Sequence, residues 1–352
     1  MKKKKIVIIK IVIIKIGDKI MSEIKEFKNR VFGCAVVKAI NANYNADFSG
    51  QPRTLPNGVV YATDKAFKYT IKNYMKDVFD TETIFYFKSL NSNLNPISLD
   101  EMYKKYFGDF PEKSKKDNSK KGENDKLKIE VATNLLSCID IRLFGATFAG
   151  ETNISIHGPV QINHGVNIWK ENNIFSEQIT SPFSNKADSN KADSNKADGS
   201  EIEKGMTTIG RQSKLEEGHY LHHYSVNPSN LKDIVETVGT KAHPISMDDI
   251  NKLKEAMRRG VTWYDSASKS GCENEILFWV QLNENSKIVL PNFTTLIDLL
   301  PDKKDGKCIY DCVKLTNELN KISDEIEKIE LYYNQITTNL INLPKNITQN
   351  DL

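Results

Sequence analysis

The sequence is poor in cysteine, and its cysteines follow no spacing that predicts cross-links. The five cysteines are odd in number and scattered over 352 residues, which does not fit a disulfide framework. Reduced thiols in a cytoplasmic compartment are the simplest interpretation. Cys308 and Cys312 lie four residues apart, but no second pair of Cys or His completes a zinc site. We therefore expect no metal-ligating residues.

A large charge excess is also missing. The formal net charge of +3 neither identifies nor excludes a polyanion-binding protein, because local clustering matters more than the total. With 39% hydrophobic and 27% charged residues, the composition is that of a soluble globular protein. The length suits one large or two modest domains.

No long apolar run is present, even near the N-terminus. The first lysines and isoleucines resemble the start of a signal peptide, but Lys10 and Lys15 interrupt the run and no cleavage site follows. A membrane-spanning helix needs about 20 mostly apolar residues, so no membrane contact is expected. We interpret residues 1–21 as a non-native or disordered extension, with Met21 as the natural start. A β-prone tail is the alternative.

The most distinctive stretch that is present covers residues 138–163. Its first half is almost entirely apolar or small, yet it contains Asp140 and Arg142. Such a pair indicates either a buried ion pair or the edge of a site. The second half alternates with the period of a strand, breaks at a Gly-Pro pair and continues with the amides of Gln161 and Asn163. These amides suit recognition of a polar backbone, and a tight turn between core strands is the alternative.

A lysine row marks the first predicted helix. That helix covers residues 65–79 and is capped at Thr63-Asp64. Lys65, Lys68 and Lys72 are three and four residues apart, so they share one face. Lysines next to a helix N-terminus suit phosphate binding. A plain solvated face is an equally good interpretation.

A second helix leads to a loop suited to anions. Ser246 caps this helix, which is predicted to end at Gly260, and a buried strand follows at 275–280. The loop 265–271 combines small hydroxyl residues and glycine with Lys269, a composition that suits anion binding by backbone N–H groups. Its Ser-x-x-Lys also matches a serine acyl-enzyme motif, but the companion motifs are missing, so we reject that enzyme class.

Three segments carry a compositional signature. Residues 112–126 are charged and poor in apolar side chains, which predicts a disordered surface loop. Repeats of Ser-Asn-Lys-Ala-Asp at 184–198 predict a flexible extension within the connection 170–205. From Leu315 to Leu340, apolar residues recur at spacings of four and three, which predicts a C-terminal helix that packs on its own domain.

Together these motifs resemble a known family: the multi-copy backbone subunit of type I CRISPR surveillance (Cascade) complexes, in the RAMP superfamily, most like the type I-B form. The resemblance covers most of 30–300, and its carriers are the segments 41–53, 61–68, 140–145, 158–163 and 246–280. It implies an α+β fold: a modified ferredoxin-like (RRM-type) palm with inserted finger and thumb segments and a C-terminal helix.

The resemblance also implies a domain plan. Residues 22–343 would form one palm domain. Its insertions would be a finger at about 80–130 and a thumb at about 167–210. A flexible tail would follow at 344–352.

The resemblance further implies that copies of the chain oligomerise along CRISPR guide RNA in the cytoplasm. With other Cascade subunits, they would present the guide for pairing with a target DNA strand. No cofactor and no catalytic residue are implied, so the chain is not expected to be an enzyme. Arg53 matches a basic residue of the family's first loop, and Lys65 and Lys68 match its basic helix face. The residues expected to bind RNA are Asn43, Arg53, Lys65, Lys68, Lys72, Gln161, Asn163, Arg211, Ser268 and Lys269.

Two alternatives come from other functional classes. Related type III backbone subunits cut bound RNA with an aspartate in the first long loop and a metal ion. Here Asp47 lies in that loop and Asp64 follows it. The other alternative is a self-assembling scaffold without nucleic acid, which predicts filaments that survive nuclease.

Overall fold

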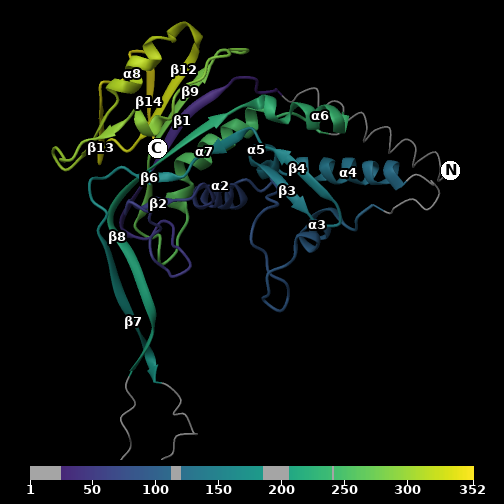
Figure 1. Ribbon diagram of the computed structural model, residues 1–352, viewed down its shortest axis with the longest axis horizontal. Coiled ribbons are helices and arrows are strands. Elements are labelled where there is room, and N and C mark those ends of the chain that lie inside the picture. The colour runs from purple at the N-terminus through teal and green to yellow at the C-terminus, as the bar shows by residue number, and fades with distance from the viewer. Residues whose placement is uncertain (1–24, 112–119, 185–205, 240–241) are drawn as a thin grey trace, which may run out of the picture.

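The computed structural model describes residues 25–111, 120–184, 206–239 and 242–352 (Figure 1). The predictions for the extension 1–21 and for the repeats from residue 185 onward lie outside these residues. The helices are α2 (Asp64–Val78), α3 (Leu99–Phe107), α4 (Lys120–Leu136), α5 (Ile139–Phe144), α6 (Lys232–Val238), α7 (Met247–Trp263) and α8 (Val313–Asn320). Short 3-10 turns lie at Pro228–Leu231, Phe293–Thr295 and Ser323–Glu325.

The strands build one large and two small sheets in an α+β fold. They are β1 (Val31–Ala42), β2 (Tyr61–Ala62), β3 (Gly145–Ala149), β4 (Asn153–His157), β5 (Val160–Ile162), β6 (Gly165–Asn167), β7 (Ile174–Ser184), β8 (Met206–Val226), β9 (Cys272–Leu282), β10 (Asp298–Leu299), β11 (Cys308–Asp311), β12 (Ile326–Tyr333), β13 (Thr338–Ile341) and β14 (Ile347–Asp351). The large sheet has the order β14-β12-β9-β1-β8-β6-β2, with β5 and β7 also paired to β8. The small sheets are β10-β11-β13 and β3-β4.

Strand β1 lies at the centre of the large sheet and is buried on both faces. It pairs antiparallel with β8 on one side and with β9 on the other. Its side chains alternate between two cores, as strand geometry requires. Ala35 and Val37 join the core formed with α2 and α7, whereas Cys34 and Val36 join the core formed with α8 and β11. The nearly continuous apolar sequence of β1 follows from this double burial.

Helices α2 and α7 follow the predicted caps. The Thr63 hydroxyl accepts a hydrogen bond from Ala66 N at 3.3 Å, and Ser246 and Asp249 form a reciprocal capping box. The predicted end at Gly260 is wrong, because α7 continues to Trp263. A Cβ at Gly260 would lie 2.8 Å from the carbonyl oxygen of Thr70 in α2. Gly260 therefore allows close packing of two helices and does not end one.

The predicted long C-terminal helix is wrong beyond Asn320. Helix α8 ends there, and the chain continues as strands β12, β13 and β14. In β12, Ile329 and Leu331 are buried and their neighbours are less so, which is the period of a strand. Antiparallel pairing with β9 decides the structure. Local spacing of threes and fours could not reveal that partner.

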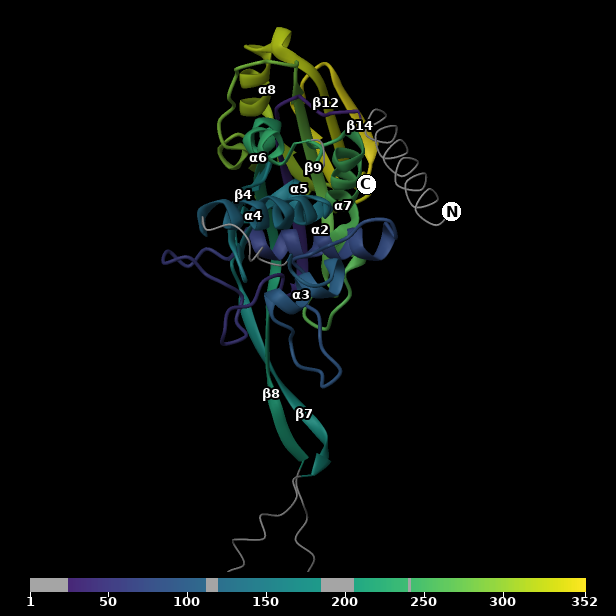
Figure 2. The same cartoon turned by 90° about the vertical axis from the view of Figure 1, so that its right-hand side faces the viewer.

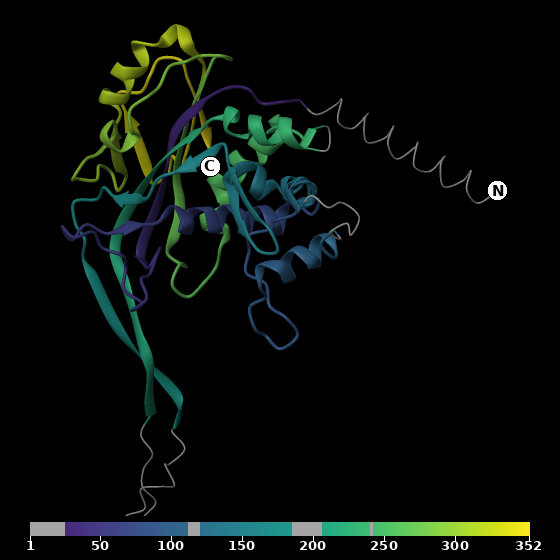
Figure 3. The same cartoon turned by 45° about the vertical axis from the view of Figure 1, so that its right-hand side comes forward.

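Two further segments, a strand ribbon and a helical group, extend the molecule (Figure 1). Strands β7 and β8 form a long two-stranded ribbon, paired from Ile174↔Leu215 to Ser184↔Met206, that projects away from the body (Figures 1 and 2). Helices α3 and α4 group beside β3 and β4, away from the C-terminal segment with α8 (Figures 1 and 3).

Residues 120–126, predicted as disordered loop, instead begin α4, whose Leu127 and Val131 are buried. Among the described residues, no helix combines the length and apolar character needed to cross a bilayer.

Candidate nucleic-acid interface

A basic cavity lies at the N-terminal end of α2. It has a volume of about 530 Å³ and lies where the loop after β1, the first turns of α2 and the loop after α7 meet. The cavity is lined by Asn45, Arg53, Thr63, Lys65, Ala66, Tyr69, Tyr264 and Lys269. Three residues predicted from separate parts of the sequence, Arg53, Lys65 and Lys269, therefore lie around one hollow.

The three cations remain available at the surface. The Lys65 side chain is 84% exposed, and its ammonium lies 3.8 Å from Asp64. Arg53 donates from Nε to the carbonyl oxygen of Ala46 at 3.1 Å, which orients the guanidinium. Lys269 lies 5.9 Å from the ring centre of Tyr264. Within the described part of the chain, neither Arg53 nor Lys269 forms an ion pair, so both can neutralise a bound anion.

The other two lysines of the predicted row are engaged inside the protein. Lys68 Nζ lies 3.2 Å from Asp64 Oδ2, and Lys72 Nζ lies 3.3 Å from Asp140 Oδ2. Asp140 is fully buried and also accepts hydrogen bonds from two backbone amides, those of Phe85 and Tyr86. Lys72 is thus the counterion of a buried carboxylate. This ion pair stabilises the fold.

Asn43 and Ser268 hold the loops that carry the cations. The amide of Asn43 is buried and donates to the carbonyl oxygens of Gly50 and Ser213 at 3.1 and 3.0 Å. Its backbone N–H donates to the carbonyl oxygen of Ser268 at 2.8 Å. These bonds join the loop after β1 to β8 and to the loop of Lys269. Both residues support the cavity from behind and do not line it.

Gln161, Asn163 and Arg211 lie outside this cavity. Gln161 is exposed on β5 and donates to the carbonyl oxygen of Gly158 at 2.8 Å. Asn163 lines a separate hollow of about 500 Å³ with Asp64. Arg211 is exposed on the ribbon, opposite Gln178. Of the ten residues predicted to bind RNA, Arg53, Lys65 and Lys269 line the basic cavity. Gln161, Asn163 and Arg211 lie at other positions.

Two tyrosines of the cavity were not predicted. The rings of Tyr69 and Tyr264 meet edge to face with centres 5.2 Å apart. Burial, followed by a hydrogen bond with Tyr264, raises the pKa of Tyr69 to about 12, so its ring stays neutral. Aromatic rings beside cations can contact a base while the cations contact phosphate. Tyr69 follows Lys65 by one helical turn, which was the available signal in the sequence.

The loop after β1 also presents an aromatic side chain at its tip. Asp47 Oδ1 accepts hydrogen bonds from Ser49 N, Ser49 Oγ and Gln51 N at 2.8, 2.7 and 3.0 Å. The bonds from Ser49 first, and then the other contacts, lower the pKa of Asp47, so the carboxylate is charged and engaged in the turn. Gly50 completes the turn with φ +83°. Phe48, between these fixed residues, is fully exposed.

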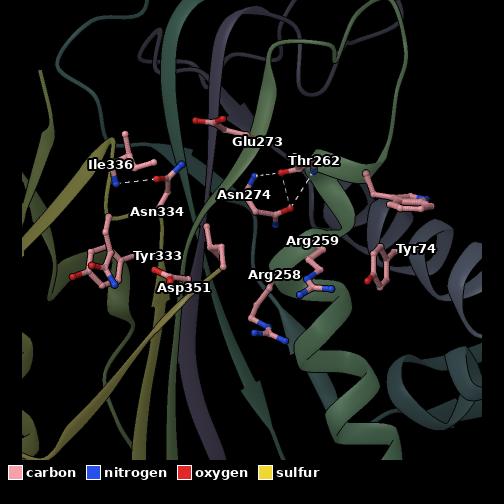
Figure 4. A pocket seen from close by; sticks show the side chains of 13 residues that line it. Tyr74, Arg258, Arg259, Thr262, Glu273, Asn274, Tyr333, Asn334, Ile336 and Asp351 are labelled. Carbon is pink, nitrogen blue, oxygen red and sulfur yellow. Dashed lines mark hydrogen bonds between the residues drawn. The ribbon is translucent and has the colours of Figure 1, made fainter.

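A larger cavity of about 670 Å³ lies elsewhere, between the end of α7, β9 and the C-terminal residues (Figure 4). Arg258 and Arg259 line it together with Trp263, Tyr333 and the terminal Leu352. Arg259 Nη1 is 3.5 Å from Glu255 on the same helix. None of the residues predicted to bind RNA lines this cavity.

Comparisons with known proteins identify one family. The family model "CRISPR-associated protein Cas7" matches residues 29–324. A solved chain described as "CRISPR RNA-guided surveillance complex, pre-nicking" is similar with a TM-score of 0.50 and 11% identity, over 92% of this chain and 96% of that one. A second, "CRISPR RNA-guided surveillance complex", has a TM-score of 0.43 and 11% identity, over 87% and 91%. No curated protein matches. Because the family model covers most of its length, the chain belongs to the Cas7 family of CRISPR-associated proteins.

Proposed function

We propose that this chain is the guide-RNA-binding backbone subunit of a type I CRISPR surveillance complex, most like the type I-B form. Copies oligomerise along the CRISPR RNA and, with other subunits, present it for pairing with a target DNA strand. The observation that carries the proposal is the cavity that Arg53, Lys65 and Lys269 line together with Tyr69 and Tyr264. This combination suits a single-stranded nucleic acid, because cations track the phosphates while rings contact the bases.

The parts of the fold take separate roles in this proposal. The large sheet with α2 and α7 acts as a ferredoxin-like palm, and the segment with α3 and α4 acts as the finger. The projecting ribbon of β7 and β8 is the thumb, with Arg211 on its surface. Phosphate contacts fix the register of the guide without reading its sequence, and base pairing supplies specificity. The protein positions RNA and performs no chemical step.

The direct test is to purify the chain after co-expression with a CRISPR array. We expect a multi-copy particle that contains protected RNA of one defined length, measured by absorbance ratio and by electrophoresis of extracted nucleic acid. Monomeric, RNA-free protein at low salt would contradict the proposal. Filaments that persist unchanged after nuclease treatment would instead support the scaffold without nucleic acid.

Replacing Phe48 with alanine is expected to weaken RNA binding about tenfold. A fully exposed ring on a turn fixed by Asp47 can stack on a base, and such stacking contributes about 1–3 kcal/mol. Phe48→Tyr should retain most of the affinity, because it keeps the aromatic face. Fluorescence titration of guide RNA measures both variants. Leu94, another exposed apolar residue at a loop tip, provides the control Leu94→Ala. Equal losses at both positions would argue against stacking.

Asp47 separates backbone binding from the RNA-cleaving alternative. Its carboxylate holds the turn through three hydrogen bonds. We therefore expect Asp47→Ala to reduce RNA affinity severalfold by loosening that turn. We also expect the unaltered chain to leave complementary RNA intact in manganese or magnesium, as judged by denaturing gels. Metal-dependent cleavage that disappears in Asp47→Ala would establish the alternative.

A further inference from the structure

A largely buried cluster of carboxylate, imidazole and thiol groups lies at the base of the ribbon, away from the basic cavity. Glu217 and His219 belong to β8, and Cys308 begins β11. One ligand atom from each of these residues lies within 4.8 Å of the others. His219 Nε2 is 3.1 Å from Glu217 Oε1 and 3.8 Å from Cys308 Sγ. The sequence associated Cys308 with Cys312, but the fold instead brings it to His219.

Both distances from His219 Nε2 are close to the ligand-to-ligand separations around a tetrahedral cation. Zinc lies about 2.0–2.1 Å from a histidine nitrogen and about 2.3 Å from a thiolate, so its ligand atoms are roughly 3.3–3.7 Å apart. Oxygen, nitrogen and sulfur are the three donor types that zinc accepts. Three donors leave one position for water. Small adjustments of the observed distances would therefore close the site around an ion.

The surroundings of His219 orient it as a ligand. Its Nδ1 lies 2.6 Å from Glu275 Oε2, and both groups are fully buried. Glu275 also accepts hydrogen bonds from the hydroxyls of Tyr310 and Thr338, at 2.7 and 3.0 Å. A carboxylate behind a histidine fixes the ring and directs its other nitrogen at the metal in many zinc sites. Here that other nitrogen, Nε2, faces Glu217 and Cys308.

We propose that Glu217, His219 and Cys308 bind a zinc-class divalent cation that ties the ribbon base to β11. Coordination replaces the Cys308 thiol proton and the proton on His219 Nε2, and both are released to solvent. Without the ion, Lys303 compensates Glu217, with Nζ at 2.7 Å from Oε1. The Lys303 side chain is 37% exposed, so it can turn outward when a cation arrives. The proposal does not depend on RNA binding.

The test uses the full, tag-free chain. Calorimetry with Zn²⁺ should give one saturable site, and zinc should raise the melting temperature by a few degrees. Co²⁺ should produce a sulfur-to-metal charge-transfer band that is absent in Cys308→Ser and present in the control Cys272→Ser. Glu217→Gln should weaken zinc binding at least tenfold. Its matched control is Glu273→Gln, because Glu273 also pairs with a lysine, at 3.0 Å from Lys38.

Lys303→Ala distinguishes a metal site from a network of ion pairs. Removal of the competing ammonium should tighten zinc binding severalfold, whereas an ion-pair network alone predicts no such gain. Glu217→Gln changes a side chain at the surface of the cluster and preserves its shape, so the test stands even if Cys308→Ser does not fold. The proposal is overturned by an absence of saturable zinc binding, by a cobalt band that persists in Cys308→Ser, or by equal zinc affinity of Glu217→Gln and wild type.

Discussion

Replacement of Arg53, Lys65 and Lys269 together by alanine is expected to weaken guide-RNA binding about a hundredfold at physiological salt. Each side chain lines the cavity at the start of α2. An exposed phosphate contact contributes about 1 kcal/mol after screening, and about 1.4 kcal/mol corresponds to a factor of ten. The dependence of RNA affinity on salt concentration should also become weaker. For single strands, the slope of log K against log salt should decrease by about 2 when three contacts are lost.

The matched control removes the same charge from other surfaces. Lys232, Lys314 and Lys321 have side chains that are more than half exposed and lie on α6, α8 and its end. Their triple alanine variant should bind RNA within about twofold of wild type, because distant charges are screened beyond about 8 Å. Filter binding at several salt concentrations compares both variants. If the two variants weaken equally, net charge and not the cavity governs binding.

Helices are predicted correctly from the sequence where a capping residue within the first turn marks their start. Thr63 and Ser246 are caps that act within one turn, and both helices begin where these residues indicate. The C-terminal segment fails for the opposite reason. Ile329 and Leu331 join the second core only because β9 lies beside β12, and that partner is distant in the chain. Spacing alone could not decide between helix and strand there.

The residues predicted to bind RNA also differ in whether local sequence signals could identify their role. Arg53, Lys65 and Lys269 share one cavity, which agrees with their assignment to a common site. Their contact with RNA stays a prediction. Lys72 has the same helical spacing as Lys65, yet it neutralises Asp140, which comes from α5. Helical spacing predicts which side chains share a face of the helix. Whether such a charged side chain is free to bind a ligand depends on its partner in the folded protein, which the spacing does not reveal.

Arg142→Met is expected to destabilise the protein by about 3–5 kcal/mol, because it leaves Asp249 charged, buried and without its cation. Arg142 donates from Nη2 to Asp249 Oδ1 at 2.7 Å and from Nη1 to the carbonyl oxygens of Leu136 and Ser137 at 3.2 and 2.7 Å. The stretch around Arg142 is thereby joined to the start of α7. Urea denaturation of RNA-free protein measures the loss. The control is Arg259→Met, whose half-exposed pair with Glu255 should contribute less than about 1 kcal/mol.

The pair also predicts a pH dependence. Burial alone would raise the pKa of Asp249, but the hydrogen bond and charge of Arg142 outweigh it and lower that pKa. A lowered folded-state pKa contributes stability above the unfolded value of about 3.9, and that contribution is lost as the pH falls through the folded value. The double variant Arg142→Met/Asp249→Asn removes both charges. It should recover part of the stability lost in Arg142→Met and flatten the acid limb of the profile. If the double variant lost as much stability as Arg142→Met and Asp249→Asn lose in sum, the two side chains would act independently.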